Sequence, residues 1–176
     1  MSPKRLSLML AFASLACSPW LHSQAMPQHE HTKGVPSTQL ELTLNSKLAT
    51  ITLADLSALP QKTVKVHNEH TQKDETYTGV ALSDLLAKYG FAVGQPTHRA
   101  MLHSYIAVEG TDKYWVLYSV TEIEPSEHEA QVIVATSING APLGEDGQLK
   151  LIDTADKRPQ RWVRNLSAIR VVNAGE

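Results

Sequence analysis

The densest group of chemically useful side chains lies near the C-terminus, in the segment KRPQRWVRN at residues 157–165. Four basic residues fall within eight positions of this segment, beside Trp162. Guanidinium groups form forked hydrogen bonds with carboxylate, phosphate or carbonyl oxygens, and an indole ring offers a flat surface for stacking. Arg161, Trp162 and Arg164 therefore indicate a site for a planar, polar heterocycle. In the competing interpretation, Trp162 anchors the core and the arginines pair with acidic residues.

Two pairs of histidines have a spacing that suits a metal ion. His29 and His31 form one pair, and His67 and His70 form the other. Imidazole is a common ligand of zinc and copper, but neither pair has a third ligand that the sequence forces to lie beside it. A histidine-based metal-binding protein is therefore one alternative function.

Several other functional classes find no support in the sequence. It contains no GxSxG motif, no P-loop and no GxGxxG fingerprint. The 16 basic and 18 acidic residues give a formal charge of −2, so a broad basic surface for nucleic acid is not expected.

The first 25 residues have the pattern of a secretory signal peptide. Lys4 and Arg5 precede an apolar stretch at residues 6–17, which is too short to cross a bilayer. Ser23 and Ala25 are small residues at positions −3 and −1 of a cleavage site. We therefore expect export to the periplasm, cleavage near Ala25, and no direct membrane insertion of the mature chain.

Cys17 is the only cysteine in the chain, and cleavage near Ala25 removes it. In the alternative, Cys17 carries a lipid, although Ser14 stands where a lipobox has leucine. Cleavage also removes two of the 16 basic residues and none of the 18 acidic ones, which leaves a formal charge of −4. A mature chain without a thiol excludes disulfides, cysteine-ligated zinc, iron–sulfur clusters and cysteine nucleophiles.

The mature chain is expected to contain a flexible leader at residues 26–38 and one folded domain at residues 39–176, because the leader is polar and holds two prolines. Alternating or β-branched runs predict strands near residues 40–44, 51, 62–66, 101–108, 114–118, 132–136, 149–152 and 169–172. Short helices are predicted after Thr52, at residues 82–89 and after Ser119. The strands outnumber the helices, so the expected fold class is α+β, with mixed β-sheets and short helices.

Three parts of the chain, taken in order, resemble the molybdopterin-binding domain of sulfite oxidase-like oxidoreductases. YTGVALSDLLAKYG at residues 77–90 resembles that family's aromatic-x-Gly-Val-x-Leu-x-Asp-Leu-Leu segment. DKYWVLYSVTEIEP at residues 112–125 resembles its Asp-Gly-Tyr strand, with Lys113 where glycine is usual. INGAPLGEDGQLKLI at residues 138–152, followed by KRPQRWVRNLSAIRV at 157–171, resembles its Asn-Gly-x-Pro-Leu turn, its Gly-x-Leu-x-Leu strand and its closing Arg-Trp-Val segment.

The resemblance covers residues 40–172 and implies that family's mixed α+β fold, which holds a pterin in a cleft lined by loops between strands. We expect Arg161, Trp162 and Arg164 to help form this cleft, with Tyr114 and His67 as further wall residues. Strand-like alternation would place Arg161 on the opposite face of the segment from Trp162 and Arg164 unless the chain turns there.

One departure from the family pattern affects the chemistry. Catalytic members hold molybdenum through a cysteine, and this chain has VKVHNEH at residues 64–70 in that place, with His67 as the nearest counterpart. Imidazole does not supply the soft thiolate ligand, so oxygen transfer at molybdenum is unsupported.

As a short, exported chain without this cysteine, the protein resembles a group of periplasmic pterin-binding proteins. Members of that group report reduced pterins to a membrane-bound enzyme of cyclic-di-GMP turnover. The resemblance implies a non-catalytic protein with a reduced pterin as ligand. The periplasmic domain of such a signalling enzyme would be its partner. The alternative is a molybdopterin-dependent oxidoreductase, with molybdopterin as the cofactor.

Overall fold

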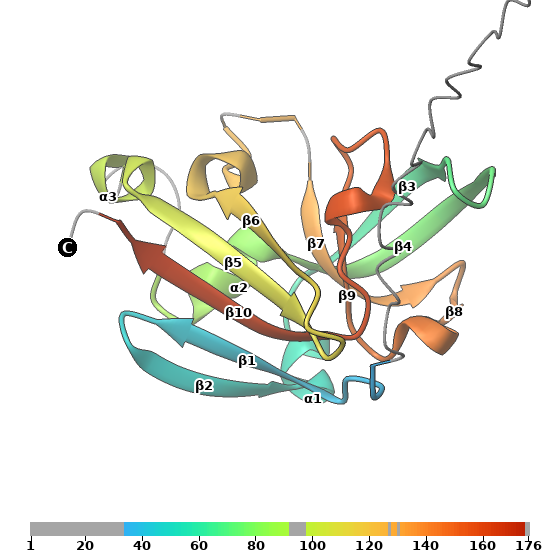
Figure 1. The fold of residues 1–176 in the computed structure, drawn as a ribbon, viewed down its shortest axis with the longest axis horizontal. Coiled ribbons are helices and arrows are strands. Elements are labelled where there is room, and N and C mark those ends of the chain that lie inside the picture. Colours follow the sequence, from blue (N-terminus) through green and yellow to red (C-terminus); the bar gives the residue numbers. More distant parts are fainter. Residues whose placement is uncertain (1–33, 92–97, 127, 130, 175–176) are drawn as a thin grey trace, which may run out of the picture. The chain divides into compact units, whose positions relative to one another are not determined.

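The computed structural model describes residues 34–91, 98–126, 128–129 and 131–174 (Figure 1). Within these residues the strands form two sheets, and the helices between them are short. The predicted α+β class is confirmed. No helix in this part of the chain is long and apolar enough to cross a membrane.

The first sheet contains, in spatial order, β2 (Lys47–Thr52), β1 (Gln39–Leu44), β10 (Leu166–Asn173), β5 (Ser104–Gly110) and β6 (Trp115–Ser119). β1 and β10 run parallel, and the other neighbours in this sheet run antiparallel. Buried side chains alternate with more exposed ones along β1 and β6. This pattern is typical of a sheet that covers the core with one face only.

The second sheet contains β3 (Gln61–Asn68), β4 (Lys73–Ala81), β7 (Val132–Ile138) and β8 (Ala141–Pro142), and β9 (Lys150–Asp153) also pairs with β7. In β7, Val132 and Val134 belong to the main core, whereas Ile133 and Ala135 belong to a smaller apolar cluster. Successive side chains of a strand point to opposite faces, so β7 is covered on both sides. This explains why its sequence is a continuous apolar run.

The helices are α1 (Leu53–Ser57), α2 (Leu82–Lys88) and α3 (His98–Leu102), and three short 3-10 helices are η1 (Val120–Ile123), η2 (Gly144–Asp146) and η3 (Pro159–Arg161). The structure confirms helical turns after Thr52 and after Ser119, each with a capping box. The predicted helix at residues 82–89 is confirmed as α2, whose buried leucines lie at helical spacing.

One predicted element is wrong in its first part. A strand was expected over residues 101–108, but Met101 and Leu102 belong to α3, and β5 begins at Ser104. Alanine, methionine and leucine are good helix formers, whereas the aromatic and β-branched residues begin only at Tyr105. The Ser104 hydroxyl also donates to the Ala100 carbonyl at 2.7 Å, which closes the helical turn.

The last residues of the predicted leader lie against the folded domain. The Thr111 hydroxyl donates to the Val35 carbonyl at 2.7 Å, and the Gln148 amide donates to the Ser37 carbonyl at 3.2 Å. Ser37 is buried. Ordered structure therefore begins upstream of Gln39. The predicted signal peptide, with Cys17, and the histidines of the leader lie outside the described residues.

Candidate functional site

A cavity of about 520 Å³ lies beside the smaller apolar cluster. Three aromatic side chains line it: Tyr77 from β4, Tyr114 from the β5–β6 turn, and Trp162 from the segment before β10. Its charged lining consists of the acidic residues Glu75, Asp112 and Asp146 and the basic residues Lys150 and Arg164. Aromatic surface next to hydrogen-bonding groups is typical of a site for a small polar organic ligand.

Lys150 is the more deeply buried basic group of this lining, with 7% of its side chain exposed. Its Nζ donates to Asp146 Oδ2 at 2.7 Å and to the Tyr77 hydroxyl at 3.0 Å. Nζ also lies 5.0 Å from the ring centroid of Tyr77 and 5.5 Å from that of Trp162. These hydrogen bonds and cation–π contacts offset the free-energy cost of removing the ammonium group from water.

The Tyr77 hydroxyl connects Lys150 to a second buried charge, Glu75. Glu75 accepts hydrogen bonds from Tyr77 at 2.7 Å, Asn68 at 2.9 Å and Thr71 at 3.0 Å. Burial opposes ionisation of Glu75, but these three bonds together with the positive charge of Lys150 outweigh it, so the pKa of this carboxyl lies below its usual value. Burial and the neighbouring Glu75 both raise the pKa of Tyr77. The hydroxyl therefore stays protonated, and the bonds run in one direction, from Lys150 to Tyr77 to Glu75.

The structure brings together three of the five residues that the sequence predicts for the site: Tyr114, Trp162 and Arg164. Trp162 is 6% exposed, and its Nε1 donates to the Asp153 carbonyl at 3.0 Å. Trp162 thus belongs to the smaller apolar cluster and also lines the cavity. The Tyr114 hydroxyl donates to the Gln160 carbonyl, which ties the β5–β6 turn to the C-terminal wall.

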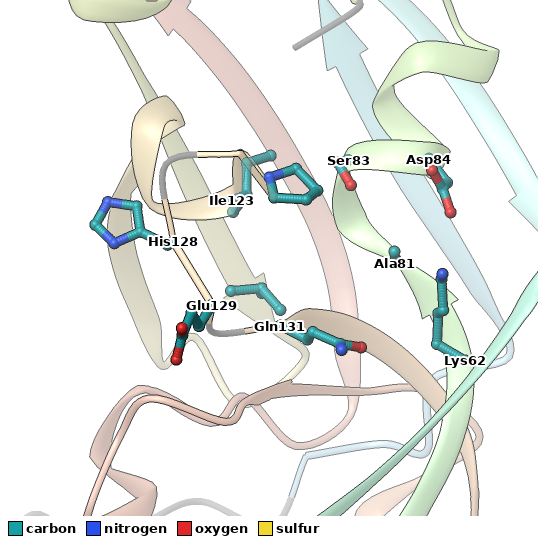
Figure 2. A pocket seen from close by; sticks show the side chains of 10 residues that line it. Lys62, Ala81, Ser83, Asp84, Ile123, His128, Glu129 and Gln131 are labelled. Carbon is teal, nitrogen blue, oxygen red and sulfur yellow. The ribbon is translucent and has the colours of Figure 1, made fainter. Parts of the chain in front are cut away.

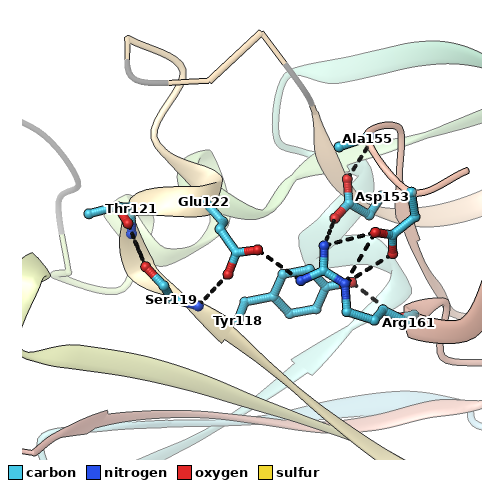
Figure 3. Close-up of polar contacts among 8 residues, drawn as sticks. Tyr118, Ser119, Thr121, Glu122, Asp153, Ala155 and Arg161 are labelled. Atoms are coloured by element: carbon cyan, nitrogen blue, oxygen red, sulfur yellow. Dashed lines mark hydrogen bonds and ion pairs between the residues drawn. The ribbon is translucent and has the colours of Figure 1, made fainter.

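Arg161 lies outside the cavity lining and binds acidic residues instead (Figure 3). Its guanidinium contacts Glu122 at 2.8 Å, Asp153 at 3.0 Å and Asp156 at 2.8 Å, and it lies 4.5 Å from the ring centroid of Tyr118. The hydrogen bond to Asp156 is the largest cause of a raised pKa for Arg161. Burial raises the pKa of Asp153. Arg161 therefore holds the segment before β10 against β6, η1 and β9.

His67 also lies outside the cavity lining, on the exposed side of β3. Its Nδ1 is 2.9 Å from Asp74 Oδ1, and the His67 hydrogen bond is the largest cause of a lowered pKa for Asp74. His70, from the β3–β4 turn, lines the cavity. The described part of the chain holds no group of three or more potential metal ligands.

Sequence reasoning missed the buried residues Glu75, Tyr77 and Lys150 and the partly buried Asp146. One signal was present for Lys150, which is the single charge in the otherwise apolar run LKLI of a returning strand. A lysine in a fully covered strand needs buried partners, and these are often functional. Nothing in the sequence identifies Tyr77 as a partner of Lys150, because 73 positions separate them.

A second cavity, of about 210 Å³, lies at the N-terminal end of α2 (Figure 2). Lys62, Ser83 and Asp84 line one side of it, and Gln131 and His128 come from the segment before β7. The described residues that line it include no phenylalanine, tyrosine or tryptophan. The larger cavity is therefore the better candidate for a flat heterocycle.

No family model and no curated protein matches this chain. Among solved structures, the sulfane dehydrogenase SoxCD from Paracoccus pantotrophus is similar, with a TM-score of 0.57 and 18% sequence identity over 76% of this chain. The fold is sulfite oxidase-like. The chain spans 37% of the length of the SoxCD chain that it matches, and at this identity the likeness concerns the fold alone.

The residues of the larger cavity do not fit a molybdenum cofactor of the kind that this fold implies. Among the described residues, its lining contains no cysteine to supply a thiolate. The lining contains three carboxylates but only one lysine and one arginine. This charge balance does not favour an anionic, phosphate-bearing cofactor. The donors and acceptors around Lys150 suit an uncharged ring with carbonyl and amino groups.

Proposed function

We propose that this protein is a non-catalytic periplasmic protein that binds a reduced pterin. The observation that carries the proposal is the cavity in which Tyr77, Tyr114 and Trp162 lie beside the ion pair between the buried Lys150 and the partly buried Asp146. Aromatic side chains suit the flat bicyclic ring, and the charged pair suits its carbonyl and amino groups. The sulfite oxidase-like fold supports the proposal by analogy.

The alternative is a molybdopterin-dependent oxidoreductase, which the name of the structural neighbour, a sulfane dehydrogenase, favours. The residues of the cavity argue against it. The chain's only cysteine, Cys17, falls within the predicted signal peptide, so no thiolate is expected in the mature protein. We therefore propose binding rather than turnover as the activity.

One preparation of the exported protein distinguishes these two functions. The protein would be purified from cells with an intact pterin pathway under anaerobic conditions, and its molybdenum content, extracted pterin fluorescence, and sulfite and sulfoxide turnover would be measured. We expect pterin near one equivalent per chain, negligible molybdenum and no turnover. Stoichiometric molybdenum with turnover would contradict the proposal. Lys62→Met, at the smaller cavity, is a control that should retain the pterin.

We also propose that the signal passes to the periplasmic domain of a membrane-bound enzyme of cyclic-di-GMP turnover. A ligand changes partner binding only if its affinity differs between two states of the protein. Such coupling is typically about 1–3 kcal/mol, which is roughly a 5- to 150-fold change in affinity. The test is the association of the purified protein with that periplasmic domain, with and without reduced pterin. Association that does not depend on pterin would remove the signalling role and leave pterin binding intact.

A further inference from the structure

We infer that Lys150 and Asp146 together recognise the lactam edge of the ligand ring. In a pterin this edge carries the C4 carbonyl, the N3–H group and the C2 amino group in a row. The inference rests on the proposed function, because it requires a pteridine in the larger cavity. It assigns the recognition of the ring to two residues outside the basic segment at 157–165.

Lys150 has one more hydrogen-bond donor than it has acceptors among the described residues. An ammonium group has three N–H donors. Two of them bind Asp146 Oδ2 and the Tyr77 hydroxyl. Within the described residues Nζ makes no third hydrogen bond, and it also lies over the rings of Tyr77 and Trp162. A buried cation gains most from a fully bonded shell, so a carbonyl oxygen in the cavity would complete it.

Asp146 supplies an acceptor directly beside this donor. Its Oδ2 binds Lys150, whereas its Oδ1 forms an ion pair with Arg164 Nε at 3.8 Å, which is longer than a hydrogen bond. Within the described structure Oδ1 accepts no hydrogen bond. A carboxylate oxygen accepts two, so Oδ1 has the capacity for an N–H group of a ligand.

The backbone holds Asp146 in this position. The Asn165 amide donates to the Asp146 carbonyl at 2.7 Å. The next residue, Gly147, has φ = 83°, and a Cβ there would lie 2.2 Å from the Asn165 side-chain oxygen. Only glycine accommodates both the positive φ and this close approach. The turn that presents Asp146 to Lys150 is therefore fixed before any ligand arrives, which lowers the entropic cost of binding.

A donor beside an acceptor is complementary to a lactam edge, which presents an acceptor beside a donor. Lys150 would donate to the C4 carbonyl, and Asp146 would accept from N3–H or the C2 amino group. Both hydrogen bonds are charge-assisted and therefore stronger than neutral ones. Glu75 is less suited to this task, because Tyr77, Asn68 and Thr71 already donate to it.

An analogue with an amino group at C4 tests this assignment. The C4 amino group would direct N–H donors at the Lys150 ammonium, which is also a donor, so the third N–H of Lys150 would stay unpaired. A site built to form a hydrogen bond strongly rejects a ligand that lacks the matching group. The probes are 6-methyl-7,8-dihydropterin and its 2,4-diamino counterpart, titrated anaerobically into the ligand-depleted full-length mature protein. We expect the wild type to bind the dihydropterin at least about tenfold more tightly than the diamino compound.

Two variants test whether Lys150 and Asp146 are the residues that recognise the lactam edge. Lys150→Met keeps the length of the side chain, and Asp146→Asn keeps its shape while offering an amide. We expect each to weaken dihydropterin binding by about tenfold or more and to reduce the preference over the diamino compound. Lys62→Met, at the smaller cavity, should change neither the dihydropterin affinity nor the preference over the diamino compound. Far-ultraviolet circular dichroism and thermal unfolding would establish that each variant is folded, and Asp146→Asn decides the matter if Lys150→Met does not fold.

The possible failures are distinguishable. Tight binding of both compounds with equal affinity would overturn the lactam assignment and leave the proposed function intact. A preference that persists in Asp146→Asn and Lys150→Met would also overturn the assignment. If the wild type bound neither compound, the proposed function would fall, and the inference with it.

Discussion

The ring of Trp162 meets the ring of Tyr77 edge to face, with centroids 5.9 Å apart and ring planes inclined at 77°. This contact joins β4 to the segment before β10, two parts of the chain that are far apart in sequence. Both rings belong to the smaller apolar cluster, and both line the larger cavity. The packing that stabilises this part of the domain is therefore also the packing that shapes the candidate site.

Substitutions of Trp162 should lower stability and ligand affinity together. Trp162→Phe retains a ring against Tyr77 but loses the Nε1 hydrogen bond, which leaves the buried Asp153 carbonyl without this donor and should lower the free energy of unfolding by about 1–3 kcal/mol. Trp162→Ala also opens a cavity and should lower it by about 3–5 kcal/mol. Urea denaturation measures both changes. Pterin affinity should fall more in Trp162→Ala, and unchanged affinity in that folded variant would limit Trp162 to a role in the core.

Substitutions of Arg161 and Arg164 should have opposite effects: the first should lower stability, and the second should lower pterin affinity. Arg161→Met removes the cation that pairs with the buried Asp153 carboxylate, so the free energy of unfolding should fall by roughly 1–3 kcal/mol. Its effect on pterin affinity should be small, because the Arg161 guanidinium lies outside the cavity lining. Arg164→Met should change stability by no more than about 0.5 kcal/mol, since its side chain is half-exposed, and should weaken binding.

The comparison of these two variants uses urea denaturation and anaerobic pterin titration on the same preparations. A large loss of affinity in Arg161→Met, with unfolding unchanged, would return Arg161 to the ligand contact that the sequence predicts. No loss of affinity in Arg164→Met would remove Arg164 from the site.

The two histidines of the HNEH segment form a further pair for comparison. His67 binds Asp74 on the exposed side of β3, whereas His70 lines the cavity. We therefore expect His67→Ala to leave pterin affinity unchanged and His70→Ala to reduce it. The measurement is the same titration. A reduced affinity in His67→Ala alone would support the sequence-based expectation that His67 is a wall residue.

Local rules predicted the parts of the fold that depend on local contacts. The capping boxes at Thr52 and Ser119 are bonds between residues three apart, so the sequence shows both partners at once. The start of β5 was misplaced because an apolar run of this length suits either a helix or a strand. In that run, the helix-forming residues before Ser104 decided the outcome.

The candidate site depended on contacts that no local rule describes. The sequence identified the segment that supplies Trp162 and Arg164 to the cavity, but it also assigned Arg161 to the cleft, which was wrong because Arg161 ends a 3-10 turn and pairs with acidic residues outside the lining. It did not identify the Lys150–Tyr77–Glu75 series, because these residues come together only when β4 and β9 lie on either side of β7. Long-range register, rather than residue type, creates the buried charges of the cavity.

Export and processing are open to a direct measurement. Lys4, Arg5 and the apolar stretch that follows predict transfer across the inner membrane, and Ser23 and Ala25 predict cleavage before Met26. We expect the intact mass of the periplasmic protein to correspond to a chain that begins at Met26. A membrane-bound species that retains an acylated Cys17 would contradict the soluble periplasmic assignment.

The stability of the domain should decrease in acid because of Glu75. The folded-state pKa of this carboxyl lies below its ordinary value of 4.5, since the three hydrogen bonds that it accepts, together with the positive charge of Lys150, outweigh its burial. A group with a lowered folded-state pKa binds protons more readily in the unfolded chain, so its stabilising contribution is complete above about pH 4.5. That contribution is lost as the pH falls through the folded-state pKa.

Glu75→Gln tests this source of pH dependence. The amide does not titrate, and its NH2 group replaces one of the two oxygens that accept from Tyr77, Asn68 and Thr71, so the variant should be less stable than the wild type at neutral pH. The difference in the free energy of unfolding should shrink as the pH falls below about 4.5, because the wild type then loses its ionised carboxylate. Urea denaturation between pH 3 and pH 7 measures this difference.

Asp74→Asn is the matched comparison. The pKa of Asp74 is also lowered, by His67 and Lys65, but this carboxyl is exposed to solvent, so the change in stability across the same pH range should be smaller. A constant difference between wild type and Glu75→Gln across this range would show that Glu75 has no lowered pKa in the folded protein.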